Sequence, residues 1–228
     1  MILILLLISG MGFQIFAALP NAYCSDGQWQ SIGDEEGVAL YRSLNETEGL
    51  LPFKAVAELE VPYERIVMAL VDAEGKPDWA PKLKATAIHS QISSNRFVYS
   101  EYYHTPWPFK DREFLLDGTV TYERNRVVFS AANSENISPA KKDHLTANIQ
   151  ELTFTVTPVS ENRTRVVFTF SGDLGGWIPD FVKTIIQKRW PVRFIQALRD
   201  HVVNNNQLET PRYRSLDKAI LDVPKAVL

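Results

Sequence analysis

The side chains that most often do chemistry are few in this chain, and their spacing matches no common catalytic or metal site. The histidines show neither His-x-His nor His-Glu-x-x-His spacing, so they do not predict a zinc site. The sequence contains no Gly-x-Ser-x-Gly elbow for a serine hydrolase and no Gly-x-Gly-x-x-Gly fingerprint for a dinucleotide. We therefore expect neither a metal nor a cofactor. The four histidines are His89, His104, His144 and His201.

Other polar side chains become candidates only if the chain encloses a cavity. Tyr99, Glu101 and Tyr103 could then serve as acid and base, which leaves a cyclase- or isomerase-like enzyme as the alternative function. Arg112 could either contact a ligand or form a fixed ion pair with Glu101 or Asp111. One of the two is needed because an unpaired buried guanidinium is costly.

Strand parity indicates which polar side chains point inward. Arg112 shares a face with Phe114 in one predicted strand. Asn148 and Gln150 share a face with Phe154 in another. These three polar residues are therefore candidates for the contacts to a ligand head group.

The candidate residues lie on a predicted run of antiparallel strands. Strand-forming segments at 37–44 and 51–61 predict a first hairpin, and the helical spacing of apolar residues after Pro62 predicts a helix over 63–71. Short turns join most of the later strands, as in an antiparallel meander, and only 135–145 is expected to be a longer loop. The strands predicted for this meander are 85–92, 96–103, 112–122, 126–132, 149–159 and 164–170.

A long helix is predicted from Pro179 to about Asn205, with one apolar stripe from Ile178 to Val202. Pro191 lies inside this helix and should kink it, because it removes one intrahelical hydrogen bond. One helix and a strongly curved sheet cannot fill the space between them everywhere, so an apolar cavity is expected. The predicted fold class is α+β, with a curved antiparallel sheet wrapped around a C-terminal helix.

The composition fits one soluble domain. Hydrophobic residues make up 45% of the 228 residues and charged residues 22%, which is usual for globular proteins. The formal net charge of -3 and a sequence pI of about 5.8 provide no broad basic surface. We therefore expect no nucleic-acid partner.

Residues 1–24 are expected to be a signal peptide or an N-terminal membrane anchor. Met1 to Leu19 carries no charge, and its aliphatic run precedes small residues as in a secretory leader, although no Lys or Arg precedes the run. A stretch of about 19 apolar residues could also span a bilayer without being cleaved. The protein is thus expected to be exported to a periplasm or secreted, or to be anchored to a membrane. Cys24 is the only cysteine, so no disulfide can form within the chain.

Three motifs resemble the START lipid-transfer family of the helix-grip, or Bet v 1-like, superfamily. Residues 106–114, Pro-Trp-Pro-Phe-Lys-Asp-Arg-Glu-Phe, are similar to the family's Pro-aromatic-Pro loop and Asp-Arg-Asp-Phe strand, with Glu113 in place of the usual Asp. Residues 172–181, Gly-Asp-Leu-Gly-Gly-Trp-Ile-Pro-Asp-Phe, are similar to the segment that leads into the family's lid helix. Trp79 matches a weaker landmark.

The resemblance implies a helix-grip fold over 25–205, followed by a C-terminal tail at 206–228. It also implies that a monomer binds one lipid or sterol-like molecule without catalysis and transfers it between membranes. The mouth is expected between the loop 104–109 and the start of the long helix, where aromatic side chains could contact a membrane surface. An interaction module with a filled core is a third interpretation. The residues expected to form the cavity and its gate are Trp79, Tyr99, Glu101, Tyr103, Trp107, Phe109, Arg112, Phe114, Asn148, Gln150, Phe154, Trp177, Ile178, Phe181, Val182 and Ile185.

Overall fold

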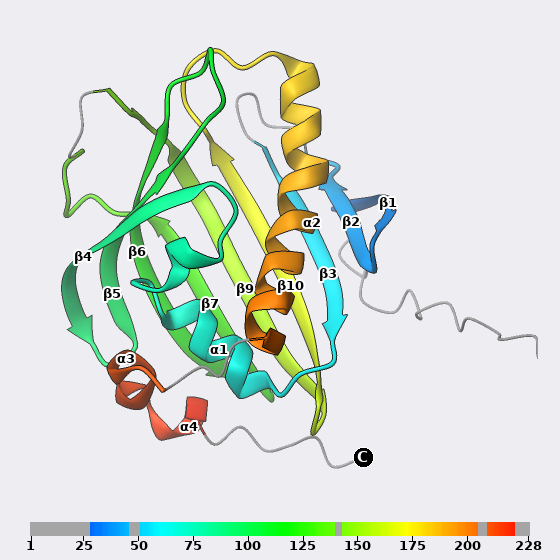
Figure 1. Ribbon diagram of the computed structural model, residues 1–228, viewed down its shortest axis with the longest axis vertical. Helices are drawn as coiled ribbons and strands as arrows, with labels where there is room; N and C mark the ends of the chain where they lie inside the picture. The colour runs from blue at the N-terminus through cyan, green and yellow to red at the C-terminus, as the bar shows by residue number, and fades with distance from the viewer. Residues whose placement is uncertain (1–27, 46–50, 140–142, 205–208, 222–228) are drawn as a thin grey trace, which may run out of the picture.

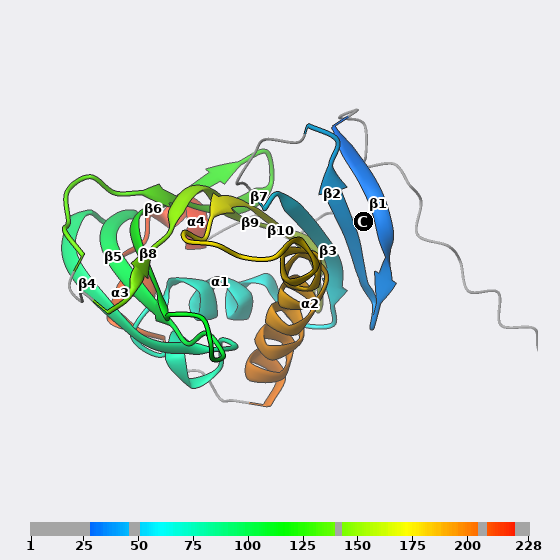
Figure 2. The ribbon, with the colours of Figure 1, turned by 90° about the horizontal axis from the view of Figure 1, so that it is seen from above.

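Ten strands form one curved sheet around two helices, α1 (Tyr63–Val71) and α2 (Asp180–Asn204) (Figures 1 and 2). The computed structural model describes residues 28–45, 51–139, 143–204 and 209–221. The strands are β1 (Trp29–Glu35), β2 (Val38–Ser43), β3 (Phe53–Leu59), β4 (Leu83–Ser93), β5 (Arg96–Tyr103), β6 (Arg112–Glu123), β7 (Arg126–Asn133), β8 (Leu145–Thr146), β9 (Asn148–Ser160) and β10 (Arg163–Asp173). Their order is β1-β2-β3-β10-β9-β7-β6-β5-β4, antiparallel throughout, and the short β8 pairs with β6 in parallel.

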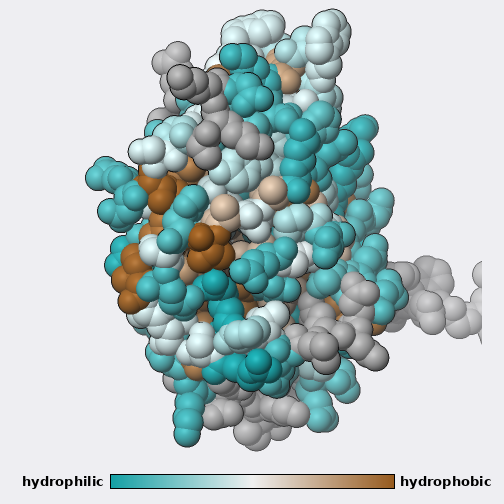
Figure 3. All heavy atoms as spheres, turned by 60° about the vertical axis from the view of Figure 1, so that its left-hand side comes forward, coloured by the Kyte–Doolittle hydropathy of each residue, from teal (hydrophilic) through white to brown (hydrophobic). Residues whose placement is uncertain are grey.

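Regular alternation turns one face of the central strands toward the helices. In β3 every second residue is buried, from Phe53 to Leu59. In β10 the alternation is the same and places Phe168 and Phe170 in the core. On the opposite face of β3 and β10 the alternate residues are half-buried, whereas β5 is buried on both faces from Phe97 to Tyr103. Figure 3 shows the β4 side of the molecule, where hydrophilic residues surround smaller hydrophobic patches. The concave face of the sheet therefore forms the core.

The pairing of β3 with β10 joins the beginning of the sheet to its end. Phe53 lies opposite Phe170, and Leu59 lies opposite Thr164. The Thr164 hydroxyl also donates a hydrogen bond to the carbonyl of Val61, at 2.7 Å. This pairing places the first hairpin, β2 and β3, beside the last strands of the meander.

Helix α1 covers one end of the concave face. It follows Pro62, whose extended backbone occupies the N-cap position, and it buries Ile66, Val67 and Leu70. The short 3₁₀ helix η1 (Lys76–Asp78) comes next and leads into β4. The sequence predicted α1 at 63–71, and the structure confirms these bounds.

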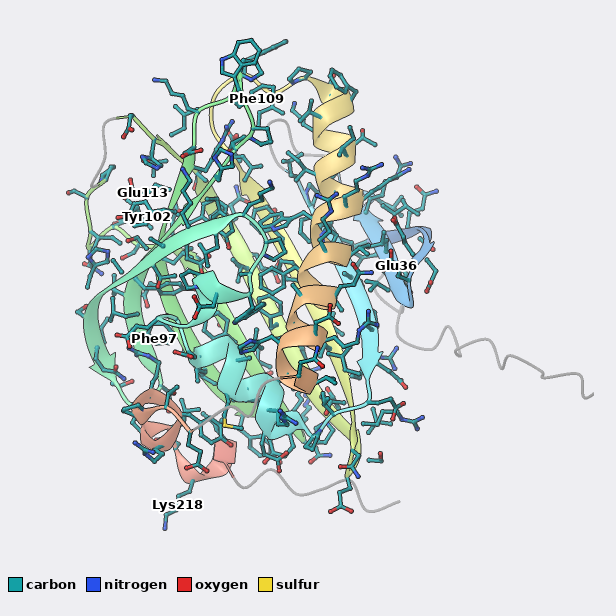
Figure 4. All side chains as sticks on the ribbon, in the orientation of Figure 1. Glu36, Phe97, Tyr102, Phe109, Glu113 and Lys218 are labelled. Carbon is teal, nitrogen blue, oxygen red and sulfur yellow. The ribbon has the colours of Figure 1, made fainter. Side chains whose placement is uncertain are left out.

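Helix α2 crosses the concave face from the end that holds Phe109 toward α1 (Figures 1 and 4). Its C-terminal half is buried at Val192, Ile195 and Leu198, whereas Phe181 and Ile185 in its first half are 69% and 47% exposed. The predicted apolar stripe therefore packs fully only in its second half, and its first half holds the residues that were expected at the cavity and its gate. The helix continues through Pro191.

Two short helices follow α2 and pack onto the same body. Helix α3 (Pro211–Ser215) is capped by the Thr210 hydroxyl, which accepts a hydrogen bond from the backbone N–H of Tyr213. Tyr213, Leu216 and Ile220, the last from helix α4 (Lys218–Leu221), are buried in the core. Lys218 lies at the end of the molecule opposite Phe109 (Figure 4). The segment that was predicted only as a tail thus contributes to the packed interior.

The predicted α+β helix-grip architecture is confirmed: a curved antiparallel sheet surrounds a long C-terminal helix. The strands of the meander are found within a few residues of the predicted bounds. The edge strand β1 was missed, because only Trp29 and Ile32 of its seven residues are even partly buried. The predicted leader, Cys24 and the residues around 205 lie outside the part of the chain that the structure describes.

Candidate functional site

A cavity of about 360 Å³ lies between the first half of α2 and the loop that joins β5 to β6, residues 104–111. We call this segment the β5–β6 loop. Phe109 projects from it at the end of the molecule where α2 begins (Figure 4). The wall is mainly apolar, as expected for a site that holds a hydrophobic ligand. The lining residues are Pro81, Lys82, Tyr103, His104, Thr105, Pro106, Phe109, Arg112, Phe114, Leu174, Ile178, Val182, Ile185, Ile186, Arg189, Trp190 and Arg193.

Trp190 forms the floor of the cavity. Its ring lies 4.9 Å from that of Phe170 and 5.7 Å from that of Phe53, measured between ring centroids. Beyond it, the ring of Phe154 stacks on Phe168 at 4.4 Å and on Phe194 at 5.2 Å, which fills the space between the sheet and the second half of α2. The cavity is therefore confined to the end of the fold beside the β5–β6 loop.

The carboxylate of Asp111 fastens the two ends of the β5–β6 loop together. One oxygen accepts hydrogen bonds from the backbone N–H of Thr105 at 2.8 Å and from the His104 ring at 3.1 Å. The other accepts a hydrogen bond from the Lys84 amine at 2.7 Å. The bond from Lys84 is the main reason why the pKa of Asp111 falls to about 2. The β5–β6 loop, which covers the cavity, is thus held in place by the ionised carboxylate of Asp111.

Arg112 lines the cavity, but it does not form the predicted ion pair with Glu101 or Asp111. Its guanidinium donates to the carbonyls of Leu174 and Gly175, both at 3.2 Å, and to the carbonyl of Lys110. The charge is therefore compensated by backbone dipoles, while Asp111 is held by Lys84. Arg112 connects the β5–β6 loop to the segment that leads into α2, so it stabilises both sides of the mouth.

The acid–base candidates lie deeper than the cavity, apart from the ring of Tyr103. Glu101 is fully buried and accepts hydrogen bonds from Lys76 at 2.5 Å and from the Tyr103 hydroxyl at 2.8 Å. The Tyr99 hydroxyl finds no hydrogen-bond partner within the described part of the chain. Burial first, and the charge of Glu101 second, raise the pKa of both Tyr99 and Tyr103 well above the usual range. These phenols therefore stay protonated at neutral pH.

Asn148 and Gln150 do not point into the cavity, contrary to the prediction from strand parity. A β-bulge lies between them and Phe154: Ser171 of β10 pairs with Glu151, but the next residue of β10, Gly172, pairs with Ile149. The extra residue shifts the parity, so Ile149 faces the core. Asn148 and Gln150 are exposed, and Asn148 accepts a hydrogen bond from Asn133 at 2.8 Å.

The structure brings seven of the sixteen predicted residues to the cavity wall: Tyr103, Phe109, Arg112, Phe114, Ile178, Val182 and Ile185. Tyr99, Glu101, Phe154 and Trp79 belong to the packed interior instead, and the Trp79 ring contacts Phe194 and His201. The expected gate residues Trp107 and Trp177 are 92% and 81% exposed. Together with Phe181 they lie on the two segments that flank the mouth, the β5–β6 loop and the start of α2.

Lys82, Arg189 and Arg193 line the cavity, although the sequence did not predict them as site residues. The two arginines are four residues apart and therefore lie on one side of α2. Such a pair is indistinguishable in sequence from an ordinary solvated helix face. Trp190 was noted only as part of the apolar stripe, and nothing in the sequence distinguished it as the floor.

Neither a metal site nor a membrane-spanning helix is found among the described residues. No group of three or more His, Cys, Asp or Glu side chains there could hold a metal ion. None of the helices in those ranges is long and apolar enough to cross a membrane.

Comparison with known proteins identifies the family. The sequence matches the START domain over residues 17–208, and no curated protein sequence matches it. The fold is similar to human StAR-related lipid transfer protein 5, with a TM-score of 0.72 and 18% identity over 80% of this chain and 90% of that one. It is also similar to human STARD10 (TM-score 0.71, 16% identity, 78% and 74% covered) and to a STAR-related lipid transfer protein from Xanthomonas axonopodis (0.66, 20%, 77% and 99%). This chain, with its sheet wrapped around α2 and a cavity beneath the β5–β6 loop, belongs to the START domain family.

Proposed function

We propose that this protein binds one lipid or sterol-like molecule in the cavity under the β5–β6 loop, without catalysis, and transfers it between membranes as a monomer. The observation that carries the proposal is the mainly apolar cavity of about 360 Å³ at the open end of the fold. A wall that includes Phe109, Phe114 and Trp190 offers a bound chain an apolar environment. Each buried methylene would contribute about 0.8 kcal/mol to binding.

The size of the cavity favours a ligand with one chain or a compact ring system. Its volume is near the lower end of the range of roughly 300–1,000 Å³ that is typical of small-molecule sites. Trp190 and the aromatic rings beyond it prevent a longer ligand from extending toward α1. A lipid with two long chains would require α2 or the β5–β6 loop to move outward.

The exposed aromatic side chains at the mouth support transfer rather than storage. Trp107 and Trp177 expose nearly their whole side chains, and Phe181 exposes most of its own. Indole rings are favoured at the interface between membrane and water. A mouth that rests on a bilayer would let the ligand pass between membrane and cavity without crossing water.

The positions of the acid–base candidates support a non-catalytic role. Glu101 directs one carboxylate oxygen at Lys76 and the other at Tyr103, and it does not line the cavity. A general base must lie within hydrogen-bond reach of its substrate. A cyclase- or isomerase-like reaction, the alternative considered from the sequence, would have to use groups other than Glu101 and Tyr99, and the hydroxyl of Tyr103 already donates to Glu101.

Native mass spectrometry of the purified protein tests the proposal. We expect a mass increase that corresponds to one lipid, which is lost in denaturing solvent and identified after extraction. Protein that carries no lipid, and that takes up none from mixed vesicles, would contradict the proposal. Transfer itself is measured as movement of a fluorescent lipid between donor and acceptor vesicles, with and without protein.

We also propose that the protein acts outside the cytoplasm. The support is the uncharged, apolar leader 1–24, which lies outside the described residues. Fractionation of the source cells, with N-terminal sequencing of the recovered protein, tests this. Recovery from the cytoplasm with Met1 in place would contradict export.

A further inference from the structure

The charged residues that line the cavity are all basic. Lys82, Arg112, Arg189 and Arg193 contribute to the wall, and no Asp or Glu is among the lining residues. The protein as a whole carries a net charge of -3, so this imbalance is local. Helix α2 contributes much of this local positive charge, since residues 181–199 contain five basic residues and no acidic one.

Three of these four cations have no partner within the described ranges. Arg112 is occupied by the carbonyls of Leu174, Gly175 and Lys110. Lys82, Arg189 and Arg193 are exposed and form neither an ion pair nor a side-chain hydrogen bond with any residue that the structure describes. Arg189 and Arg193, one helical turn apart, repel each other and so oppose folding. An anion bound at the mouth would offset the repulsion between the two arginines.

The backbone of Lys82 gives independent support. Its φ of 66° lies in the left-handed region, which side chains other than glycine rarely adopt. The other non-glycine residues with positive φ in the described ranges, Glu36, Arg124 and Asn125, lie in the turns between paired strands, where this conformation is usual. Lys82 instead lies between η1 and β4, and its carbonyl accepts a hydrogen bond from the backbone N–H of His104 at 2.8 Å. The fold thus holds a strained lysine beside the β5–β6 loop.

We infer that the ligand is an amphiphile with an anionic head group, a carboxylate or a phosphate, which Lys82, Arg189 and Arg193 bind at the mouth while its chain contacts Phe114 and Trp190. The inference rests on the proposed function and narrows its ligand class. Lys82 approaches the head group from the η1–β4 connection and the two arginines approach it from α2. Guanidinium groups suit both carboxylate and phosphate because they donate two parallel hydrogen bonds.

The test compares ligands with and without an anionic head group. Lysophosphatidic acid and the monoacylglycerol with the same acyl chain, which lacks the phosphate, are titrated below the concentrations at which they aggregate, and binding is followed by tryptophan fluorescence. The anionic lipid should bind at least about tenfold more tightly, as one additional charge-assisted hydrogen bond would give. Added salt should reduce this preference, because the three cations are exposed.

Two double variants that remove the same charge from α2 test whether the preference comes from the arginines that line the cavity. Arg189→Gln with Arg193→Gln should bring the two affinities within about threefold of each other and leave the binding of the monoacylglycerol unchanged, since only a charge-assisted contact is removed. Lys188→Gln with Arg199→Gln removes the same charge from α2 at positions that do not line the cavity. This control should keep the preference of the unmodified protein.

The remaining outcomes separate the possible sources of the anion. If both lipids bind equally, the inference is wrong and the proposed function stands; if neither binds, both fail. Inorganic phosphate at the same concentration should not displace the lipid. If the arginine variant keeps its preference for monomeric lysophosphatidic acid but no longer sediments with vesicles that contain phosphatidylglycerol, the arginines bind the membrane surface and the inference is overturned.

Discussion

The side-chain amine of Lys76 lies 2.5 Å from a carboxylate oxygen of Glu101, and both residues are almost completely buried. The pair joins η1 to β5, and the Tyr103 hydroxyl donates to the second oxygen of Glu101 at 2.8 Å. The ring of Tyr103 also lines the cavity. The Lys76–Glu101 pair therefore holds this part of the cavity wall in place through the hydroxyl of Tyr103. The Lys76 amine lies 5.7 Å from the centre of the Phe194 ring, which places it against the core side of α2.

Breaking the Lys76–Glu101 pair on one side should destabilise the protein strongly. Lys76→Met leaves the Glu101 carboxylate buried without its cation, and we expect a loss of about 3–5 kcal/mol in the free energy of unfolding. Lys76→Met with Glu101→Gln removes both charges and keeps an acceptor for Tyr103, so it should recover a large part of that loss. Urea unfolding of the two variants checks this. A double variant no more stable than Lys76→Met would show that the charge is not the cause.

Replacing Arg112 should loosen the mouth of the cavity. Arg112→Met removes three hydrogen bonds from a charged donor to backbone carbonyls, and we expect it to cost at least about 2 kcal/mol of stability. Arg112→Lys keeps the charge but cannot reach three separate carbonyls, so it should recover only part of the loss. Thermal unfolding measures both. Equal stability of all three proteins would refute this role of Arg112.

The stability of the protein should depend on pH through Asp111, which holds the two ends of the β5–β6 loop together. The pKa of Asp111 is about 2 in the folded protein, below the value of about 3.9 for an unfolded chain, so folding favours the ionised form. Its contribution to stability is present above about pH 4 and is lost as the pH falls toward 2. Asp111→Asn should therefore be less stable than the unmodified protein at pH 6, with a difference that shrinks between pH 4 and 2. A difference that is constant across this range would contradict the assignment.

Removing two aromatic side chains of the β5–β6 loop should affect transfer more than stability. Trp107→Ala with Phe109→Ala should slow the exchange of lipid between vesicles several-fold, with a smaller effect on the melting temperature, because Trp107 is 92% exposed and Phe109 is only half-buried. Ile92→Ala, an exposed apolar residue at the far end of β4, serves as the control and should leave exchange unchanged. Unchanged exchange together with a large fall in melting temperature would show that the β5–β6 loop is only a seal.

The sequence predicted the elements well because their patterns are local. Alternating apolar residues in β3 and β10 and helical spacing in α1 each depend on a few neighbouring residues. The direction of Asn148 and Gln150 failed for a reason that is not local: the bulge opposite Gly172 arises from the pairing of two strands. A Cβ atom at Gly172 would lie 3.0 Å from the carbonyl oxygen of Asn148. Glycine therefore permits the close approach of β9 and β10 at the bulge.

The charged residues of the site could not be identified from the sequence. Lys76 and Glu101 are 25 residues apart, and both residue types are ordinarily exposed. Arg189 and Arg193 have the spacing of any solvated helix face, and only the position of the cavity distinguishes them. The partners of Arg112 are backbone carbonyls, for which no residue type is diagnostic.

The pairing of β3 with β10 determines when this chain can fold as it is synthesised. Thr164 and Val61, which are hydrogen-bonded beside these strands, lie 103 residues apart. At about 5–20 residues per second, a ribosome needs on the order of 5–20 s to make that stretch, and α2 emerges later still. Until then the apolar face of β3 has no partner to cover it on the β10 side. The apolar residues of β3 therefore stay exposed on that side during synthesis, and exposed apolar strand surface of this kind promotes aggregation.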